Sequence, residues 1–231
     1  MTPSGREDGD VVRCVFIGAG GHASMLLDCL EHDRLVVVAG LLSADPGRVG
    51  TMFHAVPVLG GDELLPSLPT RGITHFVVAV GGISNNEPRR QLFDRAVAAG
   101  LEPLTIVHPR SIVSPSASIG PGSQVFAGAI IGAGARLGSN VIVNSGAIVE
   151  HDCLVADHAH VATGAVLAST VVVGTGAHIG AGATVIQMRR VGDWAIVGAG
   201  AAVVADVPDG AVVGGVPARP LGHGAEGLEP A

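Results

Sequence analysis

Hydrophobic residues follow two different periods along the chain, and the change falls near residue 107. In residues 11–107, short apolar runs that favour buried strands alternate with segments in which apolar residues recur at helical spacing. The expected strands are Val11–Gly18, Leu35–Leu42, Thr74–Gly81 and Leu101–Val107, and the expected helices are His22–Asp33 and Glu87–Gly100. This alternation predicts a small parallel sheet in an α/β domain.

From His108 onward the pattern changes to a period of six. Every sixth residue from Val113 to Val203 is Val, Ile or Leu, a register that neither a helix nor an ordinary strand would keep. Hexads of this kind are typical of a parallel β-helix, in which three hexads form one triangular coil. Each inward aliphatic residue then stacks on the residue eighteen positions later, about one strand spacing (~4.8 Å) away. We therefore expect a lead over residues 1–10, the α/β domain over 11–107, an all-β helix over 108–207 and a tail over 208–231.

Composition excludes several classes of protein. The net charge is −7, all thirteen basic residues are arginine and no basic stripe appears, so nucleic acid binding is not expected. No apolar run reaches the ~18–20 residues that span a bilayer, and the polar start MTPSGREDGD lacks the apolar core of a signal peptide. The three cysteines are far apart and form no CxxC pair, which favours a reduced, cytoplasmic protein.

Titratable side chains are concentrated in one segment of the hexad region, GAIVEHDCLVADHAH at residues 146–160. They are Glu150, His151, Asp152, Asp157, His158 and His160. A histidine beside a carboxylate suits general base catalysis, because its pKa lies near neutral pH and the carboxylate orients the ring. Solvated turn residues are the alternative interpretation.

A glycine-rich segment, GAGGHA at Gly18–Ala23, follows the first expected strand and opens a helix. Glycines let the backbone approach a phosphate, and the helix N-terminus adds partial positive charge. A dinucleotide site also needs an acidic residue at the end of the second strand, where this chain has Leu42, Ser43 and Ala44 before Asp45. A nicotinamide cofactor is therefore not expected, and a tight structural turn is the alternative to a nucleotide site.

Together these motifs resemble the PglD/NeuD-like sugar O- and N-acyltransferases of the left-handed β-helix (hexapeptide-repeat) superfamily. The resemblance covers roughly residues 12–221 and is carried by GAGGHA, AVG (Ala79–Gly81), VEHDC (Val149–Cys153), GAHIGAGATVI (Gly176–Ile186), VGAGAAVVADVP (Val197–Pro208) and GGVPARPL (Gly214–Leu221). It implies a Rossmann-like domain followed by a left-handed β-helix. It also implies transfer of an acetyl group from acetyl-CoA to a nucleotide-linked amino sugar, in a homotrimer with active sites between neighbouring prisms.

The resemblance implies specific catalytic residues. His151 and Asp152 match the family's adjacent histidine and acid, with His151 as general base and Asp152 as its partner. The family's acid is often Glu, and Glu150 is the alternative partner. The backbone N–H of Ser169, about one coil further, falls where the family places its oxyanion donor. A covalent intermediate on Cys153 is a further alternative, although packing is the expected role of this thiol.

Substrate and cofactor contacts follow from the same resemblance. The nucleotide is expected at Gly18, Gly20, Gly21, His22 and Gly81, and the sugar at Asn144 and His160, with His160 contributed across the subunit interface. Coenzyme A is expected along the small residue Gly182, with its phosphates on Arg189, Arg190 and Arg219. Solvated turns are the alternative for Arg189 and Arg190, and Trp194 either flanks the adenine or packs an end coil.

Several functions remain open at this point. The leading one is acetyl-CoA-dependent N-acetylation of a nucleotide-linked amino sugar by direct transfer. O-acetylation of a sugar or sialic-acid-type hydroxyl is the enzymatic alternative, and a non-catalytic nucleotide-sugar-binding scaffold is the other. No metal is expected. The stacked pair His160 and His178 nevertheless raises a zinc alternative of the kind found between subunits in hexad carbonic anhydrases.

Overall fold

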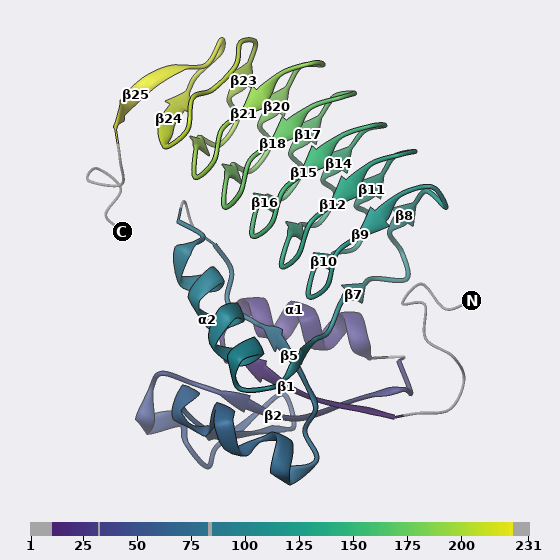
Figure 1. Cartoon of the computed structure of the whole chain (residues 1–231), viewed down its shortest axis with the longest axis vertical. Coiled ribbons are helices and arrows are strands. Elements are labelled where there is room, and N and C mark those ends of the chain that lie inside the picture. The colour runs from purple at the N-terminus through teal and green to yellow at the C-terminus, as the bar shows by residue number, and fades with distance from the viewer. Residues whose placement is uncertain (1–10, 32, 83–84, 224–231) are drawn as a thin grey trace. The chain divides into compact units, whose positions relative to one another are not determined.

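The computed structural model describes residues 11–31, 33–82 and 85–223, and the chain divides into two compact units (Figure 1). The first unit contains the chain up to Gly81 together with Arg89–Val107, and the second contains Gly82–Pro88 and the chain from His108 onward. The segment Gly82–Pro88, which the sequence assigned to the α/β domain, thus belongs to the second unit. The predicted lead over residues 1–10 lies outside the described residues.

The first unit is built on a six-stranded sheet in the order β3-β4-β2-β1-β5-β6. All neighbouring pairs are parallel except β3 with β4. The elements are β1 Val12–Ile17, α1 Gly21–Leu30, β2 Val36–Leu42, η1 Pro46–Arg48, β3 Met52–Phe53, β4 Val56–Gly60, η2 Asp62–Ser67, η3 Pro69–Arg71, β5 His75–Val78, α2 Glu87–Ala98, β6 Glu102–Pro103 and β7 Ile106–Val107. The predicted parallel α/β class is confirmed.

Two details of the predicted sheet are wrong. Strands β3 and β4 were not predicted, because they are short and β4 contains Pro57, which lowers the strand signal. The expected strand over Leu101–Val107 is split into β6, which forms the edge of this sheet, and β7, which is not part of it. Helix α2 ends at Ala98, two residues before the predicted end, and Gly100 follows it with a left-handed φ of 82°.

The second unit is a parallel β-helix of two-residue strands. They are β8 Ile112–Val113, β9 Ser118–Ile119, β10 Gln124–Val125, β11 Ile130–Ile131, β12 Arg136–Leu137, β13 Ile142–Val143, β14 Ile148–Val149, β15 Leu154–Val155, β16 His160–Val161, β17 Val166–Leu167, β18 Val172–Val173, β19 His178–Ile179, β20 Thr184–Val185, β21 Arg190–Val191, β22 Ile196–Val197 and β23 Ala202–Val203. Figure 1 shows the coils stacked one upon another, and the predicted β-helix is confirmed.

The strands form three faces, which we name after the strands of one coil. The β14 face contains β8, β11, β14, β17, β20 and β23, and the β15 face contains β9, β12, β15, β18 and β21. The β16 face includes β10, β13, β16, β19 and β22. We call the corners where the chain passes from the β14 face to the β15 face the β14/β15 edge, and we name the other edges in the same way.

The register of the coils follows the hexad prediction. Val125 pairs with Val143 and Val143 with Val161, so each inward residue stacks on the one eighteen positions later. The inward aliphatic residues from Val125 to Val203 are buried, whereas Val113 and Ile119 in the first coil are half-buried. One continuous aliphatic stack therefore forms the core of this unit.

The β-helix does not end where the hexads end. Strand β24 (Ala211–Gly214) pairs parallel with β22, and β25 (Arg219–His223) pairs antiparallel with β24. The predicted tail from residue 208 is thus wrong for these residues. Val212 pairs with Ile196, a separation of sixteen rather than eighteen residues, so a test of period six cannot detect this coil.

Two further features bear on the sequence expectations. The ring of Trp194 lies over Gly176 of the preceding coil, where an added Cβ would be 2.2 Å from the ring, so Trp194 packs against a corner of the prism. In the described part of the chain, no helix has the length and apolar character needed to cross a membrane.

The register gives a testable contrast between two adjacent valines. Val203 points inward and is 1% exposed, whereas Val204 is 43% exposed. Replacing Val203 by Ala should destabilise the protein by roughly 1–3 kcal/mol through lost burial and a residual cavity. The matched change Val204→Ala should cost well under half of that, as read from urea-induced unfolding. Equal shifts for the two variants would show that the register is wrong.

Candidate active site

The pair His151–Asp152 stands at a corner of the prism. It follows β14 and precedes β15, so the packing of these two strands fixes its position on the β14/β15 edge. Asp152 has a left-handed φ of 58°, and Gly134, one coil earlier at the same corner, has a φ of 69°. Asp adopts this conformation at lower cost than most residues. The side chains of His151 and Asp152 are 54% and 63% exposed, so the pair is open to a substrate.

The two side chains are joined by a hydrogen bond. His151 Nδ1 lies 2.9 Å from Asp152 Oδ2, and because a carboxylate accepts, Nδ1 is the donor. This leaves Nε2 as the ring nitrogen that can take up a proton. Glu150 instead accepts a hydrogen bond of 3.4 Å from the backbone N–H of His151. Of the two candidate partners, Asp152 is the one that contacts the imidazole.

Stacking of the coils brings Ser169 and Arg189 to the same edge as His151. The Thr170 N–H donates to the His151 carbonyl at 3.0 Å, and the Met188 N–H donates to the Ser169 carbonyl at 3.1 Å. Within the described ranges, no acceptor takes the backbone N–H of Ser169. One edge of the prism therefore presents a histidine–carboxylate pair and, one coil further, an available N–H donor.

The arginines expected to bind coenzyme A phosphates already have acidic neighbours. Arg189 lies 3.7 Å from Asp206, and Arg190 lies 3.3 Å from Asp209. Exposed pairs of this kind contribute about 0–1 kcal/mol, so a phosphate can replace the carboxylate at little cost. Arg219 stands apart on β25, where its side chain is exposed and donates to the Ala218 carbonyl at 2.9 Å.

Other predicted residues lie elsewhere on the prism. Asn144 follows β13 and Gly182 follows β19, so both occupy the edge between the β16 and β14 faces. His160 belongs to β16 and thus to the β16 face. A single chain therefore does not bring His160, Asn144 or Gly182 to the edge that carries His151.

His160 and His178 stack on adjacent coils, as predicted from their separation. Their ring centroids are 4.9 Å apart in an edge-to-face arrangement. His160 is 5% exposed, and its Nδ1 donates to the Gly82 carbonyl at 3.1 Å. Burial lowers the pKa of His178 to about 4, so this ring is neutral at neutral pH. Among the described residues, no group of three His, Cys, Asp or Glu side chains is placed to hold a metal ion.

Asn86, which was not predicted as a site residue, joins the segment Gly82–Pro88 to the prism by hydrogen bonds. Asn86 is fully buried, and its Nδ2 donates to the carbonyls of Gly176 and Ala177 at 3.1 and 3.2 Å. The sequence NNEP around Asn86 reads as a turn before a helix and gives no sign of burial.

Cys153 is placed as a packing residue. Its side chain is fully buried, and the thiol donates to the Ala168 carbonyl at 3.1 Å. Burial raises the pKa of the Cys153 thiol, which disfavours the thiolate that a nucleophile needs. These features oppose a covalent acyl-cysteine.

The glycine loop of the first unit joins β1 to α1. Gly18 has a φ of 122°, and an added Cβ would lie 2.6 Å from the Ala79 carbonyl oxygen, so this position requires glycine. At Gly20 and Gly21 an added Cβ would meet nothing within 4 Å, which leaves the space above the loop open. An added Cβ on Gly81 would lie 3.6 Å from His22 Nδ1, so these two predicted residues are neighbours.

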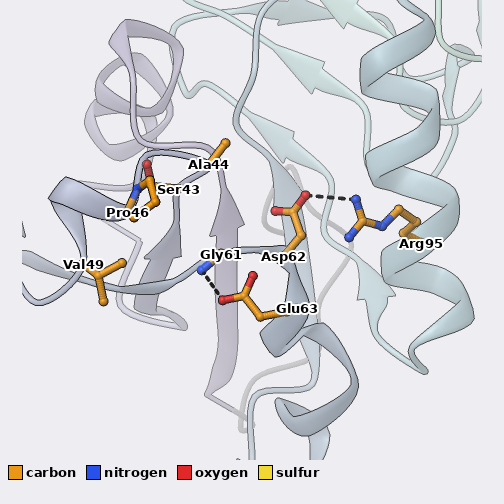
Figure 2. Close-up of a pocket in the computed structure, with 8 residues that line it drawn as sticks. All are labelled: Ser43, Ala44, Pro46, Val49, Gly61, Asp62, Glu63 and Arg95. Carbon is orange, nitrogen blue, oxygen red and sulfur yellow. Dashed lines mark hydrogen bonds and ion pairs between the residues drawn. The ribbon is translucent and has the colours of Figure 1, made fainter.

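A cavity of about 380 Å³ opens at the carboxyl ends of β2 and β4 (Figure 2). Its lining residues are Ser43, Ala44, Pro46, Val49, Gly61, Asp62, Glu63 and Arg95. Asp62 pairs with Arg95 at 3.1 Å, and Glu63 accepts from the Gly61 N–H at 2.9 Å. Two carboxylates at the start of η2 thus lie in this cavity near the end of β2, and their position was not predicted because β4 was not predicted.

Comparison with known proteins agrees with this architecture. Residues 13–96 match the family model described as the PglD N-terminal domain. PerB from Caulobacter crescentus, solved in complex with CoA and GDP-perosamine, is 38% identical, with a TM-score of 0.84 and coverage of 94% of this chain and 99% of that one. A mutant of this GDP-perosamine N-acetyltransferase is similar to the same degree. The comparison with curated proteins gave no match.

Two other solved structures are similar over nearly the full length. The acetyltransferase domain of PglB from Neisseria gonorrhoeae is 37% identical, with a TM-score of 0.83 and coverage of 90% of this chain and 99% of that one. WeeI from Acinetobacter baumannii is 25% identical, with a TM-score of 0.75 and coverage of 91% and 99%.

These similarities define a hexapeptide-repeat acyltransferase with an α/β N-terminal domain. The chain belongs to the PglD/NeuD-like sugar acyltransferases of that superfamily. The predicted fold class, an α/β Rossmann-like domain followed by a left-handed parallel β-helix, is confirmed.

Burial of His178 predicts a specific loss of stability in acid. The pKa of His178 is about 4 in the folded protein, against an ordinary value of 6.5. Between pH 4 and pH 6.5 the unfolded chain therefore binds a proton at this residue, whereas the folded chain does not. The contribution of the neutral His178 ring to the free energy of unfolding is fully present above pH 6.5. By pH 4 this contribution has fallen by about 3 kcal/mol.

Urea unfolding of wild type and His178→Gln between pH 7 and pH 4.5 tests this expectation. The variant should lose less stability on acidification than wild type. The control His54→Gln changes an exposed histidine of the first unit that contacts the Ser24 hydroxyl at 3.0 Å and no carboxylate in the described contacts, and it should leave the slope nearly unchanged. A steeper acid loss in His178→Gln than in wild type would contradict the assignment.

Proposed function

We propose that this protein transfers the acetyl group of acetyl-CoA directly to the amino group of a nucleotide-linked amino sugar. The observation that carries the proposal is the exposed His151–Asp152 hydrogen bond, with the unused Ser169 N–H one coil away on the same edge. The 38% identical GDP-perosamine N-acetyltransferase was solved with CoA and GDP-perosamine, and the acetyltransferase domain of PglB was solved with acetyl-CoA. These relatives support the choice of both substrates.

The geometry suits each step of acyl transfer. The sugar amine attacks the thioester carbonyl and forms the C–N bond, while His151 Nε2 accepts the proton that the amine loses. The Ser169 N–H stabilises the oxyanion of the tetrahedral intermediate. Collapse of the intermediate breaks the C–S bond, and His151 returns its proton to the sulfur, which releases CoA as a thiol. Asp152 holds the ring through Nδ1 and stabilises the imidazolium between these steps.

The remaining predicted residues are assigned to binding. The first unit takes the nucleotide with Gly18, Gly20, Gly21, His22 and Gly81. Asn144 and His160 contact the sugar. Coenzyme A extends along the prism past Gly182, with its phosphates on Arg189, Arg190 and Arg219. We place the reaction in the cytoplasm, in keeping with the free cysteines Cys14, Cys29 and Cys153.

The outer side of the β14 face supports assembly into a homotrimer. It carries a ladder of aliphatic side chains in consecutive coils: Ile112, Ile130, Ile148 and Val166. Ile112 is 64% exposed and the others are half-buried, which is unusual for aliphatic residues in one continuous row. Ile148 precedes the corner that holds His151, so a second copy on this face would border the reactive pair. A second copy can also bring its own His160 to that pair.

Replacement of His151 tests the mechanism. In His151→Ala and His151→Gln, kcat with acetyl-CoA should fall about 10²–10⁴-fold because proton removal from the amine is lost, while the KM values change little. Asp152→Asn should reduce kcat less. Thiol release should be measured with nucleotide-linked 3-amino and 4-amino sugars, with GDP-perosamine first, and the product should be an amide. His75→Ala serves as the control. Unchanged turnover in His151→Ala would refute the mechanism.

Replacement of Ile148 tests the assembly. Ile148→Asp places a charge in the aliphatic ladder and should convert the trimer to monomers, with loss of transferase activity, as measured by light scattering after gel filtration. Leu221→Asp is the matched control, because Leu221 is 69% exposed on β25 and lies outside the ladder. A trimeric, active Ile148→Asp protein would rule out this face as the interface.

A further inference from the structure

Arg89 is a charged residue in the interior of the first unit. It lies in the first turn of α2 and is 1% exposed. Its Nη1 donates to the Val78 carbonyl at 3.2 Å and also to the Val80 carbonyl, at the carboxyl end of β5. Burial of a charge is costly, so the guanidinium must gain from the carbonyls that surround it. Burial lowers the pKa of Arg89 to about 9, and the side chain is therefore still charged at neutral pH.

Arg48 makes a similar contact with the other loop at this edge of the sheet. It is the last residue of η1 and is half-buried. Its Nη1 donates to the Ala19 carbonyl in the glycine loop after β1. The guanidinium also lies over the ring of Phe53, 5.1 Å from the ring centre, which fixes the side chain from its other side.

The two loops held by these arginines form one structural feature. Strand β1 lies between β2 and β5, and chain order reverses between β1 and β5, which is where parallel sheets bind ligands. An added Cβ on Gly18 would lie 2.6 Å from the Ala79 carbonyl oxygen, so the loop after β1 rests directly on the loop after β5. Neither loop can move far without the other.

Fixing a carbonyl also fixes the N–H of the same peptide. In a trans peptide the C=O and N–H point in opposite directions. When Arg48 holds the Ala19 carbonyl, the Gly20 N–H points away from Arg48, and when Arg89 holds the Val80 carbonyl, the Gly81 N–H points away from Arg89. In the part of the chain that the structure describes, no acceptor takes either N–H. Arg89 also holds the Val78 carbonyl, and the N–H of the same peptide, that of Ala79, likewise points away from Arg89. This N–H differs from the other two because it donates to the Ile17 carbonyl at 2.8 Å.

We infer that Arg48 and Arg89 are positioning residues for the nucleoside diphosphate of the sugar substrate. They hold the carbonyls of the two loops so that the Gly20 and Gly81 N–H groups remain available to the diphosphate oxygens. The inference rests on the proposed function, since it assumes that a nucleotide occupies these loops. It adds that recognition of the diphosphate depends on two arginines that act through the backbone.

Steady-state kinetics distinguish positioning from general structural support. Arg48→Met and Arg89→Met should each raise the KM for the nucleotide sugar about tenfold or more, the loss expected from one charge-assisted hydrogen bond. The KM for acetyl-CoA and the kcat at saturating sugar should stay near wild type. Arg89→Lys should restore part of the effect, because an ammonium can still donate to a carbonyl. Equal increases in both KM values would overturn the inference.

A matched control lies next to Arg89 on the same helix. Arg90 is partly exposed and pairs with Asp94 at 3.3 Å, so Arg90→Met changes the charge equally without touching the loops. It should leave the KM for the nucleotide sugar unchanged. If Arg89→Met fails to fold, as judged by its melting curve, Arg48→Met and Arg89→Lys decide the question. Wild-type KM values for both would then overturn it.

Calorimetric titration with GDP and with UDP separates this inference from the proposed function. Wild type should bind one of the two, and Arg48→Met and Arg89→Met should bind it at least about tenfold more weakly. Binding by wild type with equal affinity in the variants would overturn the role of the arginines and leave the proposed function intact. Absence of binding by wild type, together with absence of turnover, would remove the proposed function and this inference with it.

Discussion

The stacking of aliphatic side chains every eighteen residues is the interaction on which the prism depends. Each inward Val, Ile or Leu removed from water contributes about 1.5–3 kcal/mol, and consecutive coils cover one another without interruption from Val125 to Val203. Because this register allows no slippage, it also fixes the corners between the strands. The pair His151–Asp152, which we propose as catalytic, is thus held at its edge by the packing of hydrophobic residues.

The same constraint gives the histidines of the prism different environments. His151 is exposed at a corner and pairs with a carboxylate, whereas His160 and His178 stack edge to face on the β16 face, where His160 is buried and His178 is half-buried. Exposure and a carboxylate suit a base that must exchange protons, while a neutral buried ring suits a hydrogen-bonding or packing role. In the first unit, arginines perform an analogous task, since they fix backbone groups rather than contact the reacting atoms.

The features that follow from the hexad repeat could be predicted from the sequence. The features that depend on contacts between residues distant in sequence could not. The hexads predicted the coils and the stacking of His160 on His178. Adjacency left Glu150 and Asp152 as partners of His151, and the family resemblance favoured Asp152, which contacts the ring. The last coil, which contains β24, was not predicted, because Val212 pairs with Ile196 at a separation of sixteen rather than eighteen residues. Burial of Asn86 and Arg89 could not be predicted, because both belong to a polar, helix-like stretch and become buried only through contacts distant in sequence.

We propose that one chain supplies His151 and a neighbouring chain supplies His160 to the same active site. Mixed assembly of two variants measures this: His151→Ala chains and His160→Gln chains, each expected to be inactive by itself, are dissociated, mixed and reassembled. Transferase activity should reappear in the mixture, because some sites then combine an intact His151 with an intact His160. If the mixture stays inactive while trimers of wild-type chains regain activity after the same treatment, the shared site is ruled out.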